Sequence, residues 1–335
     1  MRHLSLLAAL LLLTLCLASC SDSKKDGGKL GQPTSAPYEL LVVAPKDWLN
    51  GSQGEPLRQI IEKEIPCLTQ VEANFRVTSI NPVAFRGAFL YYANVLMADI
   101  GSKYAEAEMQ VARNVYCQPQ VLVKLVAPDE ASFARLCEER IDDVLRLFND
   151  SELKRGVQRL QRQFSGIVQK QAQKQFGCDV RAPEELNAIK VGKDFFWASA
   201  EGRHENYLNL CMYSYAYTSA DQLTDEAIVQ KRDSFMRQNI EGETLEDGRV
   251  PYMTTDHRVM QTRAIKVGNV NVIELRGLWA MEYDAMGGPF VSYTFVDTDR
   301  QRILTAEGFV YAPNKKKREL IRRLEAALQT VTLNK

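Results

Sequence analysis

The chain of 335 residues is long enough for one large domain or two modest ones, and its 42 basic residues balance its 42 acidic residues. This zero net charge argues against a general nucleic-acid-binding protein, which would carry a basic surface. Only three histidines occur, and no C-x-x-C pair is present, so we expect neither a metal centre nor a bound cofactor.

The N-terminus has the pattern of an export signal. Met1-Arg2-His3 is a short basic start, and residues 4–15 are almost entirely leucine and alanine. This run is shorter than the roughly 20 apolar residues that a membrane-spanning helix needs, and no later run is as apolar. We therefore expect a signal peptide over residues 1–19.

The end of this signal is Leu17-Ala18-Ser19-Cys20, which resembles the lipobox at which bacterial lipoproteins are lipidated and cleaved. Small residues before the cysteine suit a peptidase cleft, and the thiolate of Cys20 is the group that takes a diacylglyceryl chain. The resemblance implies that two or three acyl chains hold the mature protein on a membrane. The alternative is an ordinary secretory signal in which Cys20 is incidental.

Residues 20–37 are expected to form the lipidated cysteine and a flexible linker, because they are polar, contain glycine and lack apolar periodicity. The expected location is the cell envelope, with the protein anchored in the outer membrane and facing the periplasm. Exposure on the cell surface stays open, since Lys24 and Lys25 dilute the acidic character of the linker.

The first half, residues 38–176, combines short β-rich runs with long amphipathic helices. Strands are expected at 38–44, 75–80, 89–100 and 121–126, and a helix starts at Pro56 and ends before Pro66. Residues 102–114 fit either a short helix or an ordered loop.

Two helices are expected at the end of this half, at 129–149 and 151–176, with capping residues Asn149-Asp150-Ser151 between them. Residues 129–150 carry seven acids and three bases, whereas residues 151–176 carry one acid and six bases. These charges suit two solvated helix faces. Alternatively, the basic helix contacts anionic lipid or a polyanionic cell-wall polymer.

The second half, residues 177–335, is rich in predicted strands. The strands 195–199 and 207–217 suit a hairpin, and one face of the latter carries mainly tyrosines, which indicates cross-strand packing or a carbohydrate or peptide platform. A helix is expected at 224–240 and another at 314–328. Further strands are expected at 258–267, 270–279, 290–297 and 302–311.

Strands that occur in neighbouring pairs favour an α+β fold over a doubly wound parallel sheet. We predict two halves of similar size that meet near residue 176, each with antiparallel sheets covered by helices. Five cysteines follow Cys20, an odd number, so at least one of them is expected to be free.

No nucleophile elbow, zinc-protease or phosphate-loop motif occurs, so we assign no catalytic residue. The densest unusual stretch, residues 276–290, holds a candidate ligand-binding site in which Arg276 grips an anionic group against aromatic rings. The structural alternative is a tight connection held by an internal arginine–aspartate pair and a buried tryptophan. The candidate ligand-binding residues are Arg276, Trp279, Tyr283, Asp284 and Asp297.

Several segments resemble the signature segments of an uncharacterised family, a domain of unknown function found in lipoproteins of Bacteroidota-type bacteria. They are Cys117-Gln118-Pro119-Gln120, Asp194-Phe195-Phe196-Trp197, Lys231-Arg232-Asp233-Ser234, Tyr252-Met253-Thr254-Thr255, Arg276-Gly277-Leu278-Trp279, Met286-Gly287-Gly288-Pro289-Phe290 and Glu307-Gly308-Phe309-Val310-Tyr311-Ala312-Pro313. The resemblance covers nearly all of residues 38–330. It implies an envelope location and brings no activity, ligand or catalytic residue.

Two hypotheses follow for the function. The first is a non-enzymatic envelope lipoprotein that binds or scaffolds, with the membrane as partner through its N-terminal lipid and an envelope protein or polymer as a second partner. The second is a hydrolase or transferase that acts on envelope material through a site near Arg276, Asp284 and Asp297. A convergence of these three side chains in an open cleft would favour the enzyme.

Overall fold

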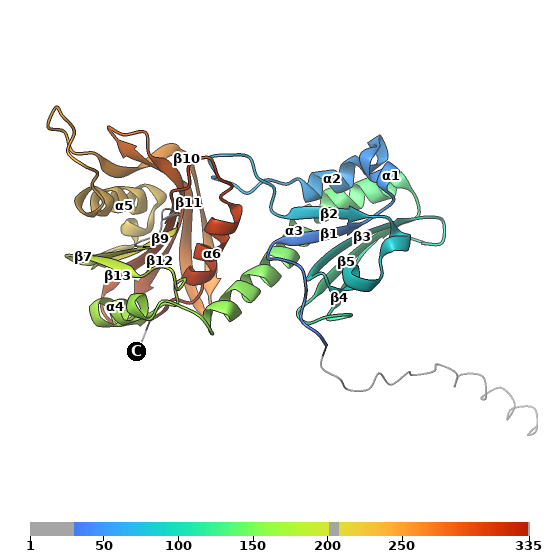
Figure 1. Cartoon of the computed structure of the whole chain (residues 1–335), viewed down its shortest axis with the longest axis horizontal. Coiled ribbons are helices and arrows are strands. Elements are labelled where there is room, and N and C mark those ends of the chain that lie inside the picture. Colours follow the sequence, from blue (N-terminus) through green and yellow to red (C-terminus); the bar gives the residue numbers. More distant parts are fainter. Residues whose placement is uncertain (1–29, 201–207, 334–335) are drawn as a thin grey trace, which may run out of the picture.

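The computed structural model describes residues 30–200 and 208–333, which form two sheet-containing halves bridged by one long helix (Figure 1). Helices and strands are present in similar amounts, so the predicted α+β class is confirmed. The predicted signal peptide, Cys20 and the start of the predicted linker lie outside the described residues. So does the polar loop 201–206 between the two strands of the predicted hairpin.

The first half is built on a five-stranded sheet with the order β2-β1-β3-β5-β4. Its central pairs β1–β2, β1–β3 and β3–β5 are parallel, and only the edge strand β4 is antiparallel to its neighbour. The strands are β1 (Glu39–Val43), β2 (Arg76–Ile80), β3 (Asn94–Ile100), β4 (Glu108–Arg113) and β5 (Val121–Ala127).

This parallel pairing differs from the antiparallel pairing expected for the first half. The physical reason is burial on both faces, which gives strands such as Val121–Ala127 a near-continuous apolar sequence. One face packs against α1 (Lys46–Asn50), α2 (Glu55–Ile61) and α3 (Glu130–Leu160). The other face packs against the segment of the short turns η2 (Pro82–Ala84) and η3 (Gly87–Tyr91). Residues 102–114 were expected to form a short helix or an ordered loop, and they instead contain the edge strand β4.

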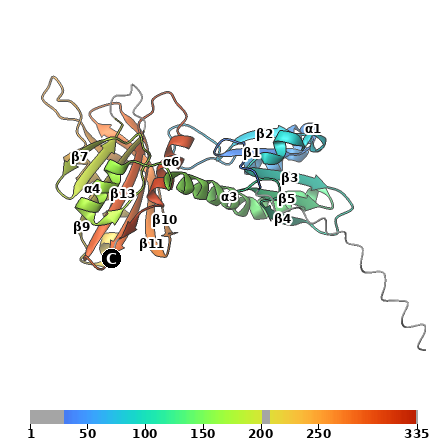
Figure 2. The same cartoon turned by 60° about the horizontal axis from the view of Figure 1, so that its bottom comes forward.

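Helix α3 runs without interruption through the predicted break at residues 149–151 and spans both halves (Figure 2). Asp129 caps its start by accepting a 2.8 Å hydrogen bond from the amide of Ser132. The actual break lies at residues 161–165, where Ser165 caps α4 (Gly166–Phe176), and Gly177 ends α4 in the left-handed conformation. The caps at 149–151 are unused because Phe148 packs on the first sheet while Leu160 packs in the second half.

The second half is built on a seven-stranded antiparallel sheet with the order β10-β11-β12-β13-β9-β8-β7. The strands are β7 (Ala188–Gly192), β8 (Phe195–Ser199), β9 (Leu208–Ala216), β10 (Tyr252–Val267), β11 (Val270–Glu282), β12 (Gly287–Asp297) and β13 (Arg302–Val310). The short strands β6 (Cys178–Asp179) and β14 (Thr332–Leu333) pair separately. The predicted strands of this half are confirmed, with β10 and β11 longer than expected.

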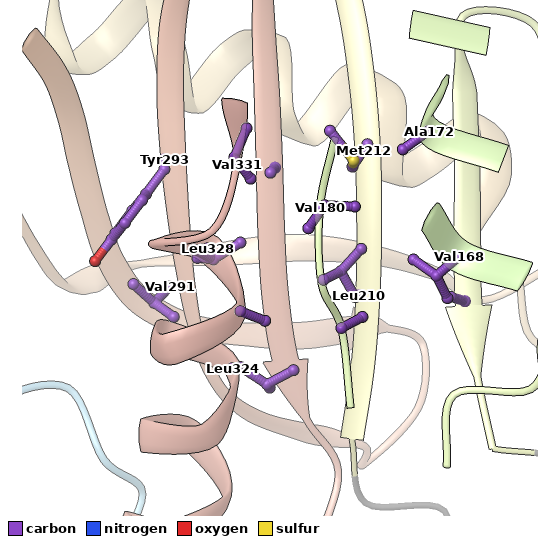
Figure 3. Close-up of a cluster of buried hydrophobic side chains, with 14 of the residues drawn as sticks. Val168, Ala172, Val180, Leu210, Met212, Val291, Tyr293, Leu324, Leu328 and Val331 are labelled. Carbon is purple, nitrogen blue, oxygen red and sulfur yellow. The ribbon is translucent and has the colours of Figure 1, made fainter. Parts of the chain in front are cut away.

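Helices cover both faces of this sheet. Side chains of α4 and α6 (Arg318–Leu328) form the core on one face, where Val168, Leu324 and Leu328 meet Leu210 and the other strand residues drawn in Figure 3. Helix α5 (Asp225–Asn239) covers the opposite face and with it the tyrosine face of β9. The ring of Tyr213 stacks on that of Phe235 at 4.6 Å, so this face is packing surface and no open platform.

The two halves are also joined at the start of α6, where the basic residues Lys315, Lys316 and Lys317 come directly before the positive end of the helix dipole. Glu72 of the first half adds a negative charge at this helix end. Its carboxylate accepts hydrogen bonds from the amides of Lys317 at 2.6 Å and Arg318 at 3.3 Å.

The position of α4 bears on where the halves divide. Its side chains Val168, Ala172 and Phe176 belong to the core of the second half, so the packing changes near residue 165. The division at residue 176 stays a prediction. All five domain cysteines are free thiols, and burial raises the pKa of Cys137 to about 12.

Candidate functional site

The first sheet has a crevice at the edge where its parallel strands end. In the sheet, β2 lies on one side of β1 and β3 lies on the other side. The chain passes from β1 to β2 in one direction and then crosses back to β3, so the direction of the connections reverses between β1 and β3. Ligands of parallel α/β sheets bind outside the carboxyl ends of the strands at such a switch point. The crevice has a volume of about 450 Å³, which suits a small organic molecule.

One wall of the crevice is apolar. Val43 at the end of β1 and Met97 on β3 form its floor, and Trp48 on α1 forms one side. The indole of Trp48 is held edge-on against the ring of Phe133 at 5.5 Å. The wall is therefore preformed by core packing and needs no ordering when a ligand binds.

The other wall is charged. Asp99 on β3 lies between the ammonium groups of Lys103 and Lys124, at 3.0 Å and 2.9 Å, and accepts a 2.5 Å hydrogen bond from the hydroxyl of Tyr104. Lys124 also donates to the Tyr104 hydroxyl at 3.0 Å. Two ammonium groups against one carboxylate leave one positive charge in excess at the mouth of the crevice.

The protonation states of this wall favour binding over acid–base chemistry. Burial alone would raise the pKa of Asp99, but hydrogen bonds from Tyr104, Lys124 and Lys103 lower it to about 2. The pKa of Lys124 is raised by its hydrogen bonds to Tyr104 and Asp99, and that of Lys103 by Asp99. All three groups stay charged near neutral pH, whereas a general acid or base has a pKa near the working pH.

Arg276, the leading residue of the predicted site, is bound by carboxylates other than the predicted aspartates. It is 6% exposed on β11 and donates to Glu274 through Nε at 2.8 Å and Nη2 at 3.1 Å. Its Nη1 forms an ion pair with Glu325 of α6. Arg263 also pairs with Glu274, and Arg322 pairs with Glu325, so three guanidinium groups share two carboxylates.

The arginines of this cluster hold both carboxylates in their ionised form. Burial alone would raise the pKa of Glu274, but Arg276 and Arg263 lower it to about 2. Burial would lower the pKa of Arg276, but Glu325 and Glu274 raise it well above its usual value. The cluster adjoins a cleft of about 540 Å³ between the halves, which Tyr293 also lines. Each of the three guanidinium nitrogens of Arg276 contacts a carboxylate, which favours a structural role for this side chain.

The remaining predicted site residues lie apart from Arg276. Trp279 is 3% exposed on the opposite face of β11, where its indole N–H donates to the carbonyl of Val310 at 3.1 Å. Tyr283 and Asp284 are exposed in the turn before β12. Asp297 ends β12 and pairs with Arg302 at 2.9 Å.

Strand β12 separates the two aspartates by about 35 Å along its length. The structure therefore does not bring the five predicted residues together, and Arg276 does not pair with Asp284 or Asp297. The buried tryptophan of the structural alternative is present, but the predicted arginine–aspartate pair is replaced by two arginine–glutamate pairs.

A second buried ion pair lies on the other face of the large sheet, under α5. Arg232 and Glu307 are both fully buried and form a bidentate pair, with Nε–Oε2 and Nη2–Oε1 distances of 2.9 Å and 2.8 Å. The guanidinium carbon of Arg232 also lies 3.8 Å from the ring centre of Phe290. Arg232 and Glu307 lie within the resemblance segments, and no role for either residue was predicted from the sequence.

The crevice residues Asp99, Lys103, Tyr104 and Lys124 were not singled out from the sequence. The available signal was the set of apolar runs 39–43, 94–100 and 121–127, which are typical of parallel strands. A polar residue at the end of such a strand, as Asp99 is, marks the edge where ligands bind.

Within the described part of the chain, no helix is long and apolar enough to span a membrane. The same residues contain no group of three or more histidine, cysteine, aspartate or glutamate side chains that would hold a metal ion.

Comparison with protein families gives two matches that divide the chain. Residues 34–161 match a domain of unknown function, DUF8532, and residues 165–330 match another, DUF4837. No curated protein matches the chain. The matches confirm the predicted similarity to uncharacterised domains, while the lipoprotein character and bacterial group implied by the resemblance stay predictions.

Proposed function

We propose that this chain is a lipid-anchored protein of the cell envelope whose first half binds a small anionic molecule with an apolar body. The observation that carries the binding role is the crevice at the switch point of the parallel sheet, with an apolar wall and an excess positive charge. The anchor is supported by the lipobox-like sequence before Cys20. The proposed location is the outer membrane on its periplasmic side.

This assignment favours binding over the hydrolase or transferase alternative. The alternative needed Arg276, Asp284 and Asp297 to converge, and their positions on β11 and at the two ends of β12 are far apart. In the crevice, the carboxylate and both ammonium groups are held in their charged forms. The two ammonium groups attract and orient an anion, and Asp99 offsets only one of their two charges.

The binding role is tested with anilinonaphthalene sulfonate, a fluorescent probe that joins an aromatic body to one negative charge. We expect saturable binding by the folded protein, weakened about tenfold or more in Lys103→Gln/Lys124→Gln, since a charge-assisted hydrogen bond contributes about 1.5–3 kcal/mol. The matched control is Lys170→Gln, an exposed lysine on α4 of the second half. Equal affinity in the parent and the double variant would exclude the crevice as the anion site.

The anchor is tested by mass spectrometry of the mature N-terminus, purified from the envelope fraction of a lipoprotein-processing bacterium. We expect Cys20 to be the first residue and to carry diacylglyceryl and acyl groups. Cleavage elsewhere, or an unmodified Cys20, would remove the anchor and leave the binding role of the crevice to be judged separately.

A further inference from the structure

A basic groove lies at the amino edge of the first sheet, the edge opposite to the crevice. We define it by Leu30, Pro37, Pro119, Arg155, Arg159 and Arg162, which line a cavity of about 630 Å³. Its lining contains no aspartate or glutamate. The arginines come from the last turns of α3 and the segment after it.

The positive charge of the basic groove is only partly neutralised. Arg155 forms an ion pair with the buried carboxylate of Glu152. Arg159 and Arg162 are exposed, and across residues 30–200 and 208–333 their side chains form no ion pair or hydrogen bond. Partial burial and the neighbouring charge of Arg155 lower the pKa of Arg159, and the charge of Glu152 opposes them.

The basic groove also lies where the chain leaves the folded body. The amide of Gln118 donates to the carbonyl of Gly31 at 2.9 Å, and the amide of Thr34 donates to that of Tyr91 at 3.0 Å, which fixes the segment after Leu30 on the sheet. Leu30 is the tenth residue after Cys20, and a fully extended chain over that span reaches about 35 Å at most. A lipid on Cys20 therefore keeps the groove within a short distance of the membrane surface.

We propose that the basic groove faces the membrane and binds the phosphate headgroups of anionic phospholipids in the leaflet that holds the lipid of Cys20. This inference rests on the proposed lipid anchor. An arginine at an anionic lipid surface favours the bound orientation by roughly a factor of five. Arg159 and Arg162 together supply that attraction, and the 38% exposed Leu30 places an apolar side chain at the same rim.

The test uses the full mature lipidated protein, reconstituted into vesicles of phosphatidylcholine alone or of equal parts of phosphatidylcholine and phosphatidylglycerol. Flotation of the vesicles reports anchoring. Phenylglyoxal modification, measured for each arginine by mass spectrometry, reports which face is shielded. We expect Arg159 and Arg162 to react several-fold more slowly on the anionic vesicles, while Arg135, at the other end of α3, reacts equally on both.

Two variants separate the groove from general charge effects. In Arg159→Gln, the shielding of Arg162 by anionic vesicles should fall by roughly a factor of five. In the matched control Arg135→Gln, on an exposed position of the same helix, the shielding of Arg162 should be unchanged.

Three results would overturn the inference. Equal reaction of Arg162 on both vesicle types, with the protein still floating, would remove the groove as a lipid site and leave the anchor intact. Shielding by soluble polyphosphate but not by phosphatidylglycerol would assign the groove to a polymer instead of a membrane. Failure of the protein to float would remove the anchor and this inference together.

Discussion

The charged groups of the two halves differ in exposure and in balance. In the crevice of the first half, the side chains of Lys103, Lys124 and Asp99 are 63%, 30% and 30% exposed, and positive charge is in excess. In the second half, Arg232 and Glu307 are fully buried and matched. Groups of the first kind remain available to a ligand, whereas groups of the second kind hold the fold together.

The largest effect on stability is expected for Arg232→Met, which tests the structural role of the buried pair. We expect the free energy of unfolding to fall by about 3–5 kcal/mol, because the charge of Glu307 is left buried without a partner. Urea denaturation measures the effect. The control Arg258→Met removes an exposed pair with Asp256 and should change stability by less than about 1 kcal/mol. Equal effects of the two variants would contradict a structural role for the buried pair.

The second prediction concerns acid stability and Glu274. Its pKa of about 2 in the folded protein lies below its ordinary value of 4.5, so the folded state binds fewer protons. The resulting stability, about 3 kcal/mol, is fully present above pH 4.5 and is lost as the pH falls towards 2. Urea denaturation at several pH values should therefore show a weaker acid dependence in Glu274→Gln than in the parent.

Burial raises the pKa of Glu307 against the opposing effect of Arg232, so this group makes the folded state less stable as the pH rises. The contribution of Glu307 is the same in the parent and in Glu274→Gln and therefore cancels from the comparison. Identical pH profiles for the parent and Glu274→Gln would show that Glu274 is not held ionised by its arginines.

A third prediction addresses the link between the halves. Glu325→Gln removes one charge between Arg276 and Arg322, and Arg322 in turn donates to Asn74 at 2.8 Å and to Asn149 at 3.1 Å. We expect a loss of about 2 kcal/mol in stability, measured by thermal unfolding. Glu319→Gln, on the exposed side of α6, should cost less than about 1 kcal/mol. If Glu325→Gln lost no more stability than Glu319→Gln, the buried cluster would contribute no more than an exposed ion pair.

The smallest effect on stability is expected in the crevice. Lys103→Gln/Lys124→Gln should change the free energy of unfolding by about 1 kcal/mol or less, because these pairs are partly exposed to solvent. The same variant is the one expected to lose anion binding. A large loss of stability on urea denaturation would contradict the contrast between the halves.

The sequence predicts the second half better than the first, for a physical reason. Antiparallel neighbours such as β10 and β11 are joined by the short turn at Gly268, so their pairing is local and visible in the sequence. The parallel pairing of β1 with β3 joins residues more than fifty positions apart, and no local signal encodes the strand order. The crevice depends on that order, so its residues were missed.

The predicted ligand site around Arg276 shows which contacts a sequence pattern can reveal and which it cannot. Alternation along β11 places Arg276 and Trp279 on opposite faces, which the sequence alone already implies once the strand is recognised. The true partner Glu325 was not recognisable, since an acidic residue on an amphipathic helix usually faces water. Because α6 packs on the sheet, Glu325 becomes a buried ion-pair partner of Arg276.

The parallel strands of the first sheet also give the molecule a polarity. Their amino ends lie at the basic groove, and their carboxyl ends lie at the crevice, about 20 Å away along a seven-residue strand such as β3. With the groove resting on phospholipid, the mouth of the crevice opens away from the bilayer. The molecule would then capture solutes that diffuse through the aqueous compartment, and not amphiphiles drawn from the leaflet beneath it.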